Sequence, residues 1–239
     1  MEKNTIIDKK KTWRLCFIVL IISFCQGLFF STGLVLAGEN DKNPESKLDW
    51  ILKTIKEKEK GLKTLSGTFR QTKKTSLLKE PLYSEGKVYF DSTGKLLFEV
   101  TSPSPLIILM EGDRFLIHYP DLLKTEEISA AKNSHILKTY FGIGRTIQEL
   151  KKRYDIRLIT GTDSEQYHLR MIPKKRSMKK YIDFIDVAVN PENWLPETID
   201  FREKEGDQSS IELRFNMINE PLPKDIFRIN MHEDRGEGL

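Results

Sequence analysis

The distribution of apolar residues divides the chain into a helical segment followed by strands. From residue 44 the apolar positions recur at helical spacing with charged residues between them, which is typical of an amphipathic helix. Asn43 is a suitable N-cap, and Pro44 is suited to the first helical position. The pattern predicts a helix over residues 44–65, closed near Ser66-Gly67. The apolar positions of its buried face are Leu48, Ile51, Leu52, Ile55 and Leu62.

Strands follow, because from Gly67 the apolar residues show the two-residue period of a pleated sheet. Composition marks turns between them, for example at 91–94 and 111–113, so consecutive strands are expected to pair antiparallel. We expect about nine or ten strands, in two groups separated by a middle segment, the last a short strand at 226–230. The middle segment contains helix formers and predicts two short helices, residues 129–141 and 146–153. Thr146 and Glu149 fit a capping box for the second.

The stretch from Gly94 to Pro120 departs from strand alternation. Residues 106–110 and 115–117 are apolar on both faces, although the chain as a whole is rich in charge and has a mean hydropathy of −0.44. Such a hairpin requires cover on both sides, because monomers rarely expose large apolar patches. One face can pack on the first helix, and the other on the middle helices. A curved sheet covered by helices could also enclose an apolar cavity, and the pattern leaves open whether side chains fill that space. The fold class is α+β, with helices on one side of a large curved sheet.

The first 37 residues resemble a secretory signal peptide. A basic start precedes an uncharged run from Leu15 to Ala37, and small or apolar residues stand before a cleavage point after Ala37. The run is also long enough to remain as a membrane anchor. A third alternative is a lipoprotein signal cut before Cys25, although Phe24 stands where that signal prefers a small residue. We therefore expect residues 38–239 to form one domain in the periplasm, with 1–37 cleaved or kept as an anchor.

Removal of this segment changes the charge and the cysteine count. The chain has 39 Lys and Arg against 35 Asp and Glu, and 1–37 carries five of the former and two of the latter. The remaining 34 basic and 33 acidic residues are nearly balanced, so a nucleic-acid partner loses its support. Both cysteines, Cys16 and Cys25, also lie in the segment. The domain therefore has neither a disulfide nor thiol chemistry.

Signals for catalysis are weak. The four histidines, at 118, 135, 168 and 232, lack metal-ligand neighbours at helical or strand spacing, and His118 is expected to have a hydrogen-bonded structural role. The "GIGR" at 142–145 lacks the rest of a phosphate-binding loop. The basic run at 174–180 predicts an exposed hairpin loop, with contact to anionic lipid head groups or to an acidic partner as an alternative. We expect neither a cofactor nor a metal, and no enzymatic activity. An esterase would need a serine, histidine and acid set, which scattered histidines serve poorly.

Four segments, in order, resemble the periplasmic outer-membrane lipoprotein carriers, the LolA-like family. They are "LSGTFRQT" at 65–72, "EGKVYFDSTGKLLFEVTSPSPLIILMEGDRFLIHYP" at 85–120, "NWLPETIDF" at 193–201 and "NEPLPKDIFRIN" at 219–230. The second is the most specific, with its aromatic strands, turn, proline and final Tyr119-Pro120, which is similar to the family's Tyr-x-Pro. The resemblance implies an incomplete antiparallel β-barrel, closed by the N-terminal helix and the mid-chain helices as a lid, around a hydrophobic cavity.

The resemblance also implies a function. Members carry the acyl chains of lipoproteins in this cavity, from an inner-membrane ATP-driven exporter to an outer-membrane receptor. We therefore expect a monomeric carrier whose partners are acylated lipoproteins or lipids. The predicted lipid-binding residues are Leu96, Phe98, Val100 and Ile108 on the sheet, Leu48 and Leu52 on the first helix, and Ile136, Leu137, Tyr140 and Phe141 on the middle helix.

One position departs from the family. Well-studied members place an arginine before the turn that precedes the second aromatic strand, where it helps to hold the lid closed. Ser92 stands there in this chain. The lid is then held in another way, or the protein is a diverged carrier of another lipid. A membrane-anchored sensor or interaction module of the same fold, whose cavity is only a core, is the remaining alternative.

Overall fold

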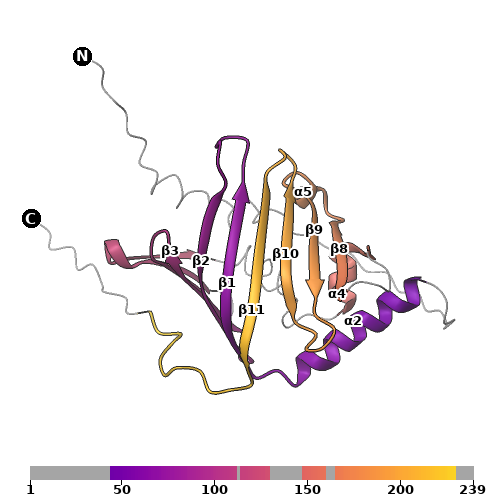
Figure 1. The fold of residues 1–239 in the computed structure, drawn as a ribbon, viewed down its shortest axis with the longest axis horizontal. Coiled ribbons are helices and arrows are strands. Elements are labelled where there is room, and N and C mark those ends of the chain that lie inside the picture. Colours follow the sequence, from indigo (N-terminus) through magenta and orange to yellow (C-terminus); the bar gives the residue numbers. More distant parts are fainter. Residues whose placement is uncertain (1–43, 112–113, 130–146, 160–164, 230–239) are drawn as a thin grey trace, which may run out of the picture.

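A computed structural model describes residues 44–111, 114–129, 147–159 and 165–229. They form one antiparallel sheet of eleven strands with short helices, so the predicted α+β class is confirmed (Figure 1). The strands are β1 (Thr64–Lys74), β2 (Leu82–Asp91), β3 (Lys95–Ser102), β4 (Leu106–Glu111), β5 (Arg114–Tyr119), β6 (Lys124–Ser129), β7 (Tyr154–Leu158), β8 (Tyr167–Pro173), β9 (Ile182–Val189), β10 (Pro196–Glu203) and β11 (Gln208–Ile218). The helices are α2 (Pro44–Lys60), α4 (Ile147–Arg153), α5 (Arg176–Lys179) and the 3-10 turn η1 (Pro120–Leu122).

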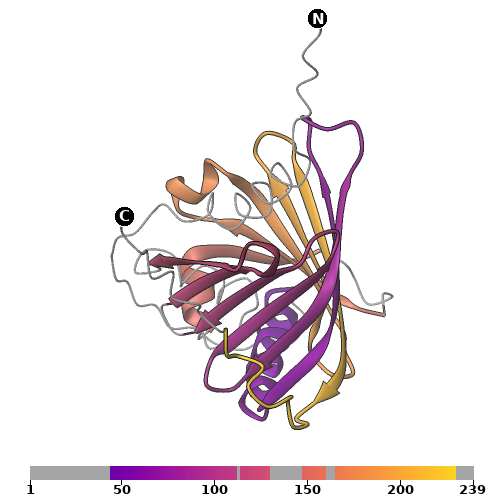
Figure 2. The same ribbon diagram turned by 90° about the vertical axis from the view of Figure 1, so that its left-hand side faces the viewer.

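The sheet consists of two meanders that share one seam. Its strand order is β6-β5-β4-β3-β2-β1-β11-β10-β9-β8-β7. At the seam β1 pairs with β11, so that Phe69 lies opposite Leu213. In Figure 2 the two halves lie at an angle to one another, and the strongly curved sheet partly surrounds a common space. Because β6 and β7 stand at opposite ends of the order, the described strands make an incomplete barrel, as predicted.

Two glycines allow this curvature. Register shifts occur in β1 between Ser66 and Gly67, and between Glu85 and Gly86 where β2 meets β3. A Cβ atom at Gly86 would lie 1.9 Å from the carbonyl oxygen of Glu99, and one at Gly67 would lie 2.2 Å from that of Arg214. Such irregularities bend strands and increase their twist, which is how sheets of this size curl. Only glycine permits backbones to approach this closely.

Helix α2 covers the lower end of the concave side in Figure 1. Its buried residues Leu48, Ile51 and Leu52 belong to the large core cluster on the concave face. An ion pair between Asp49 and Lys151 links α2 to α4. No helix within the described residues is long and apolar enough to cross a membrane.

The part of the sheet around β3 to β5 is buried on both faces, which explains the failed alternation at 94–120. On the concave face Leu96, Phe98 and Val100 contribute to the main core, together with the alternate residues of the neighbouring strands. The opposite face carries a second cluster, formed by Tyr89, Leu97, Leu109 and Leu116. Residues 219–229, which we call the C-terminal strap, pack on this outer cluster through Leu222, Ile226, Phe227 and Ile229. The strap therefore provides the outer cover that we had expected from the middle helices.

Several predicted boundaries were wrong. The first helix ends at Lys60 instead of residue 65, because Gly61 follows and Thr64 to Ser66 already pair with β2. Residues 124–129 form the strand β6, which went unpredicted, and its last residue was assigned to a helix. The segment 226–229 contains turns instead of a strand, and residues 176–179 of the expected hairpin loop form helix α5. The predicted helix at 146–153 is confirmed as α4, whereas residues 130–141 lie outside the described residues.

Candidate functional site

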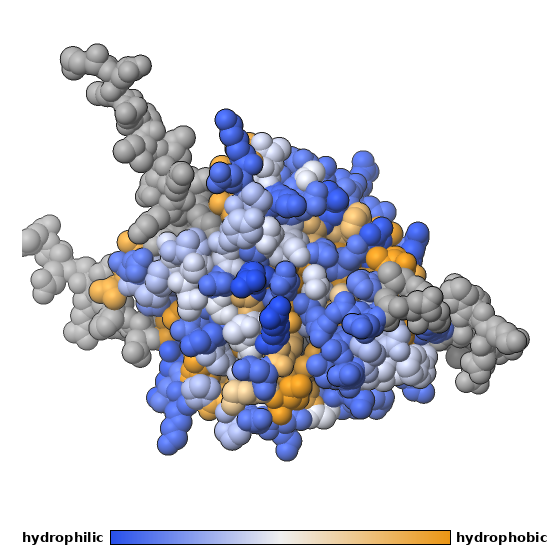
Figure 3. Space-filling model, viewed as in Figure 1, coloured by the Kyte–Doolittle hydropathy of each residue, from blue (hydrophilic) through white to orange (hydrophobic). Residues whose placement is uncertain are grey.

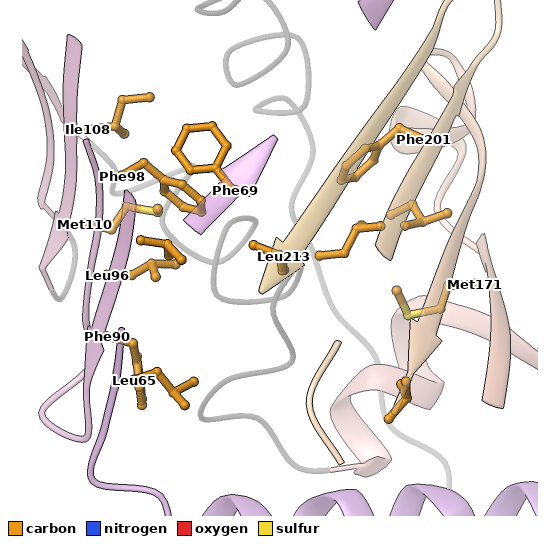
Figure 4. Packing of buried hydrophobic residues seen from close by; sticks show 14 of the residues in the cluster. Leu65, Phe69, Phe90, Leu96, Phe98, Ile108, Met110, Met171, Phe201 and Leu213 are labelled. Atoms are coloured by element: carbon orange, nitrogen blue, oxygen red, sulfur yellow. The ribbon is translucent and has the colours of Figure 1, made fainter. Parts of the chain in front are cut away.

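Apolar side chains from both halves of the sheet point into the space that the sheet partly surrounds. Figure 4 shows Phe69, Phe98 and Ile108 on one side of this space, facing Phe201 and Leu213 on the other. The rings of Phe69 and Phe98 meet edge to face, with their centroids 5.3 Å apart. Alternation places these residues on one face, because every second side chain of a strand points the same way. The concave face therefore carries a large apolar surface, whereas the face of the molecule seen in Figure 3 is mostly hydrophilic.

A cavity of about 380 Å³ opens at the lower end of this surface, beside α2. Apolar side chains form most of its wall, and they come from α2, β1, β2, β3, β10, β11 and the adjoining turns. These residues are Ile55, Leu62, Leu65, Val88, Phe90, Leu96, Trp194, Leu195, Pro196, Phe215 and Ile218. Its polar lining residues are Lys58, Glu59, Glu192, Asn193 and Asn219, with Gly61 beside them. Such a lining suits an apolar ligand with few polar contacts.

The turn between β9 and β10 places one wall of the cavity. The side-chain oxygen of Asn190 accepts a hydrogen bond from the backbone N–H of Glu192, at 2.7 Å. Trp194 follows with a φ of 62°, a left-handed conformation that non-glycine residues rarely adopt. This conformation brings the Trp194 ring onto Tyr167, stacked at 5.3 Å, and edge-on to Trp50 at 5.4 Å. Three aromatic residues thus meet where Trp194 lines the cavity.

Asn219 fixes the opposite wall. Its side-chain oxygen accepts a hydrogen bond from the Lys63 backbone N–H at 2.7 Å, and its amide nitrogen donates to the Gly61 carbonyl at 3.1 Å. Its own backbone N–H donates to the Thr64 carbonyl at 2.9 Å. One residue after β11 therefore holds the connection between α2 and β1. The cavity depends on contacts between segments more than 150 residues apart in the sequence.

The geometry offers little for catalysis. Among the described residues no group of three or more His, Cys, Asp or Glu could hold a metal ion. His118 hydrogen-bonds through Nδ1 to the hydroxyl of Thr125 at 2.9 Å, which confirms its structural role. Burial raises the pKa of Tyr89, but this residue belongs to the outer cluster under the strap. The arrangement can bind an apolar group, and its described part shows no reacting set.

A family model of the outer membrane lipoprotein carrier protein LolA matches residues 60–230 of this chain. The chain belongs to the LolA family. The matched region runs from the end of α2 through all eleven strands and the strap. It therefore includes most of the cavity wall. No match was found among curated protein sequences.

Several solved structures resemble this chain, although they share little of its sequence. A LolA-superfamily protein from Nitrosomonas europaea has 14% identity, covers 74% of this chain and 97% of its own, and has a TM-score of 0.39. The lipoprotein LppX of Mycobacterium tuberculosis has 13% identity, coverages of 75% and 98%, and a TM-score of 0.44. The MucA/MucB complex of Pseudomonas aeruginosa has 12% identity, coverages of 77% and 61%, and a TM-score of 0.48. Similarities of this size add no argument to the family assignment.

The predicted lipid-binding residues fall into two groups. Leu48, Leu52, Leu96, Phe98, Val100 and Ile108 are all buried in the concave core. Of these, Leu96 lines the 380 Å³ cavity, whereas the other five belong to the surrounding core. Ile136, Leu137, Tyr140 and Phe141 lie outside the described residues. Their role in binding stays a prediction.

Sequence reasoning missed several residues of the cavity wall. Leu65, Phe90 and Leu96 face one another across three adjacent strands, because Leu65 pairs with Phe90 and Phe90 with Leu96. Phe90 could have been identified once Leu96 was chosen, because the two residues lie opposite each other on the same face of the β2–β3 hairpin. No pattern in the sequence would have placed Trp194 or Phe215 there, since their positions depend on a turn and on the pairing of the first strand with the last.

Ser92, where the resemblance led us to expect an arginine, lies in the turn between β2 and β3. Its backbone N–H donates to the Lys63 carbonyl at 2.7 Å. The preceding Asp91 accepts hydrogen bonds from the Thr93 backbone N–H at 2.9 Å and its hydroxyl at 2.5 Å. In this LolA-family protein the turn is thus an Asx turn tied to the α2–β1 connection. The side chain at 92 brings no cation to hold a lid.

Proposed function

We propose that this protein is a periplasmic carrier that binds the acyl chains of lipoproteins, or of another lipid, and moves them from the inner to the outer membrane. An ATP-driven exporter in the inner membrane would load it, and a receptor at the outer membrane would unload it. The cargo binds without covalent chemistry. The proposal requires that residues 1–37 be removed after export, because a chain anchored in the inner membrane could not move to the outer membrane.

The observation that carries this proposal is the apolar cavity beside α2 in a chain of the LolA family. Its volume of about 380 Å³ lies at the lower end of the range of roughly 300 to 1,000 Å³ for ligand pockets. Its charged lining residues, Lys58, Glu59 and Glu192, are few compared with the apolar ones. An acyl chain matches this distribution, because it needs apolar contact along its length and a polar environment only at one end.

The expected affinity for a single acyl chain is weak. Each buried methylene contributes about 0.8 kcal/mol, so roughly ten methylenes contribute about 8 kcal/mol. Association costs about 4 kcal/mol or more in lost freedom of movement. The remaining 4 kcal/mol corresponds to a dissociation constant on the order of 1 mM for one chain. Tighter binding therefore needs a second acyl chain or a contact to the head group. Moderate affinity would also allow the outer-membrane receptor to take over the cargo.

A fluorescent fatty acid tests the proposal. The exported protein is titrated into 12-(9-anthroyloxy)stearate, and saturable binding is expected. Ile55 is half-buried and lines the cavity, so Ile55→Phe fills part of the space without adding charge. A loss of about two methylene contacts weakens binding on the order of tenfold.

The matched control is Ile172→Phe, since Ile172 is also half-buried but is not part of either core cluster or the cavity wall. We expect it to bind like the parent. Thermal unfolding of both variants checks their folding. The proposal fails if the parent shows no saturable binding, or if the folded Ile55→Phe and Ile172→Phe variants bind the probe equally well.

A further inference from the structure

Four polar residues lie together at the end of the concave face away from α2. They are Gln71 and Lys73 on β1, Ser84 on β2, and Ser209 on β11, and all four are buried. Figure 1 shows this end of the sheet at the top, where the β1–β2 and β10–β11 hairpins project. We call these residues the polar cluster. Buried polar groups cost free energy unless they are paired, so their presence beside an apolar surface needs a reason.

The strand register makes the cluster contiguous. Gln71 lies directly opposite Ser84 on one side, and Lys73 lies opposite Ser209 on the other. Gln71 and Lys73 continue the alternation that places Leu65 and Phe69 in the concave core, after the bulge at Gly67. The cluster therefore belongs to the same face of the sheet as the cavity.

The hydrogen bonding of the cluster is incomplete. Ser84 donates its hydroxyl to the side-chain oxygen of Gln71 at 3.2 Å. Lys73, only 7% exposed, donates to Glu203 across a long 3.4 Å contact, although its ammonium carries three N–H donors. Ser209 is 2% exposed, and its hydroxyl is the only buried side-chain polar atom in the described parts of the chain that has no partner. Unpaired buried groups are rare and call for an explanation.

We propose that the polar cluster binds the oxyanion of an acyl lipid's head group, a carboxylate or a phosphate, while the acyl chain lies along the concave face toward the cavity. Lys73 supplies the positive charge, and the Ser209 hydroxyl and Gln71 amide supply uncharged donors. Glu203 is the acid that faces Lys73, and its side chain is 24% exposed. The ligand's oxyanion replaces Glu203 at Lys73, and the Glu203 carboxylate turns to water.

The distances along β1 fit such a ligand. Leu65 lines the cavity, and Gln71 lies six residues further along the same strand. At about 3.3 Å per residue this separation is roughly 20 Å. One leaflet of a bilayer, which one layer of acyl chains fills, is about 15 Å thick. A chain whose end lies in the cavity therefore brings its head group close to Gln71 and Lys73. This step rests on the proposed function, because it assumes that the concave face binds acyl chains. It fits a cargo lipid with an anionic head group, since the ester and amide linkages of a lipoprotein's acyl chains carry no oxyanion.

The test compares three ligands of equal chain length: stearate, stearoyl lysophosphatidic acid and methyl stearate. Each displaces a neutral fluorescent probe, the methyl ester of 12-(9-anthroyloxy)stearate, from the exported protein. The proposed function predicts that all three bind. The polar cluster predicts that at least one of the two anionic lipids binds tenfold or more tightly than the methyl ester, and the stronger of the two identifies carboxylate or phosphate as the group recognised.

Variants separate charge recognition from folding. Lys73→Met keeps the aliphatic stem and should abolish the preference for the anion while leaving the affinity for methyl stearate unchanged. Lys73→Arg should retain most of the preference. Lys74→Met is the matched control, because Lys74 is the exposed neighbour of Lys73 on the same strand. Ser209→Ala should reduce the preference several-fold, yet raise the thermal stability of the ligand-free protein, because it removes an unpaired buried hydroxyl.

Two results overturn the inference, and they differ from failure of the proposed function. Equal affinity for the three ligands in the parent protein shows that the head group is not recognised, although acyl chains bind. A preference that survives in folded Lys73→Met places recognition elsewhere. If none of the three ligands displaces the probe, both the carrier function and the head-group site are wrong.

Discussion

Phe227 in the C-terminal strap offers a direct test of how the outer face of the sheet is covered. Phe227 is half-buried and packs on the outer cluster, and the ammonium of Lys95 lies 5.8 Å from its ring centroid. Replacing a fully buried phenylalanine by alanine costs about 3–5 kcal/mol. Because Phe227 is partly exposed, we expect Phe227→Ala to cost about 2 kcal/mol, including the contact with Lys95.

In a domain of this size, 2 kcal/mol corresponds to a decrease in melting temperature of about 4–8 °C. Thermal unfolding followed by far-UV circular dichroism measures it. Arg228→Ala is the control, since the side chain of the adjacent Arg228 is 79% exposed and should contribute less than about 0.5 kcal/mol. Leu97→Ala, on the sheet beneath the strap, should couple to Phe227→Ala by about 0.5 kcal/mol or more. Equal melting temperatures for Phe227→Ala and Arg228→Ala would show that the strap does not cover this cluster in solution.

Three further predictions concern the sheet. Gly86→Ala should destabilise the fold by more than about 2 kcal/mol, because its Cβ would lie 1.9 Å from a backbone oxygen. The control Gly61→Ala should be nearly neutral, since its Cβ would meet its nearest atom at 3.7 Å. Urea unfolding measures both, and equal midpoints would refute the prediction. Arg170 donates two hydrogen bonds to Asp186, at 2.8 and 2.6 Å. Arg170→Ala should therefore lower the free energy of unfolding by about 1–2 kcal/mol, and Arg170→Lys should restore only part of this loss. Full restoration by lysine in thermal unfolding would contradict the bidentate pairing. Burial raises the pKa of Tyr89, so the folded state favours its neutral form, and this stabilisation is present below about pH 10 and lost as the pH rises through the higher folded pKa. Tyr89→Phe should therefore reduce the loss of stability above pH 10, and an unchanged profile would argue against it.

The local pattern of apolar residues predicted the helices and strands that are determined by residues close together in the sequence. The helical spacing of Leu48, Ile51 and Leu52 identified α2. The two-residue period identified β1 and β2, and apolar runs between turns identified β3 to β5. The apolar residues on both faces of β4 correctly indicated cover on both sides. The identity of the outer cover could not be predicted, because residues 219–229 show neither period and contact strands more than 100 residues away in the sequence.

The sequence predicted that an apolar cavity could exist, but it predicted only some of the residues that line it. Leu96, which was chosen because it shares the concave face of β3 with Phe98, lines the cavity. The contribution of Phe215 depends on the pairing of β1 with β11, and that of Trp194 on a left-handed turn held by Asn190. The local hydrophobic pattern indicates neither this strand pairing nor this turn. The polar cluster was missed for a similar reason, since Ser209 meets Lys73 only through the register of the seam.

Mass spectrometry of the protein purified under native conditions from the periplasm shows directly whether it carries lipid. We expect the exported chain to carry an acylated lipid or lipopeptide, released on denaturation, and Ile55→Phe to carry substantially less of it than Ile172→Phe. Protein that is free of acylated molecules, in cells that actively export lipoproteins, would contradict the carrier function. Equal loading of the two folded variants would show that the cargo does not occupy the cavity beside α2.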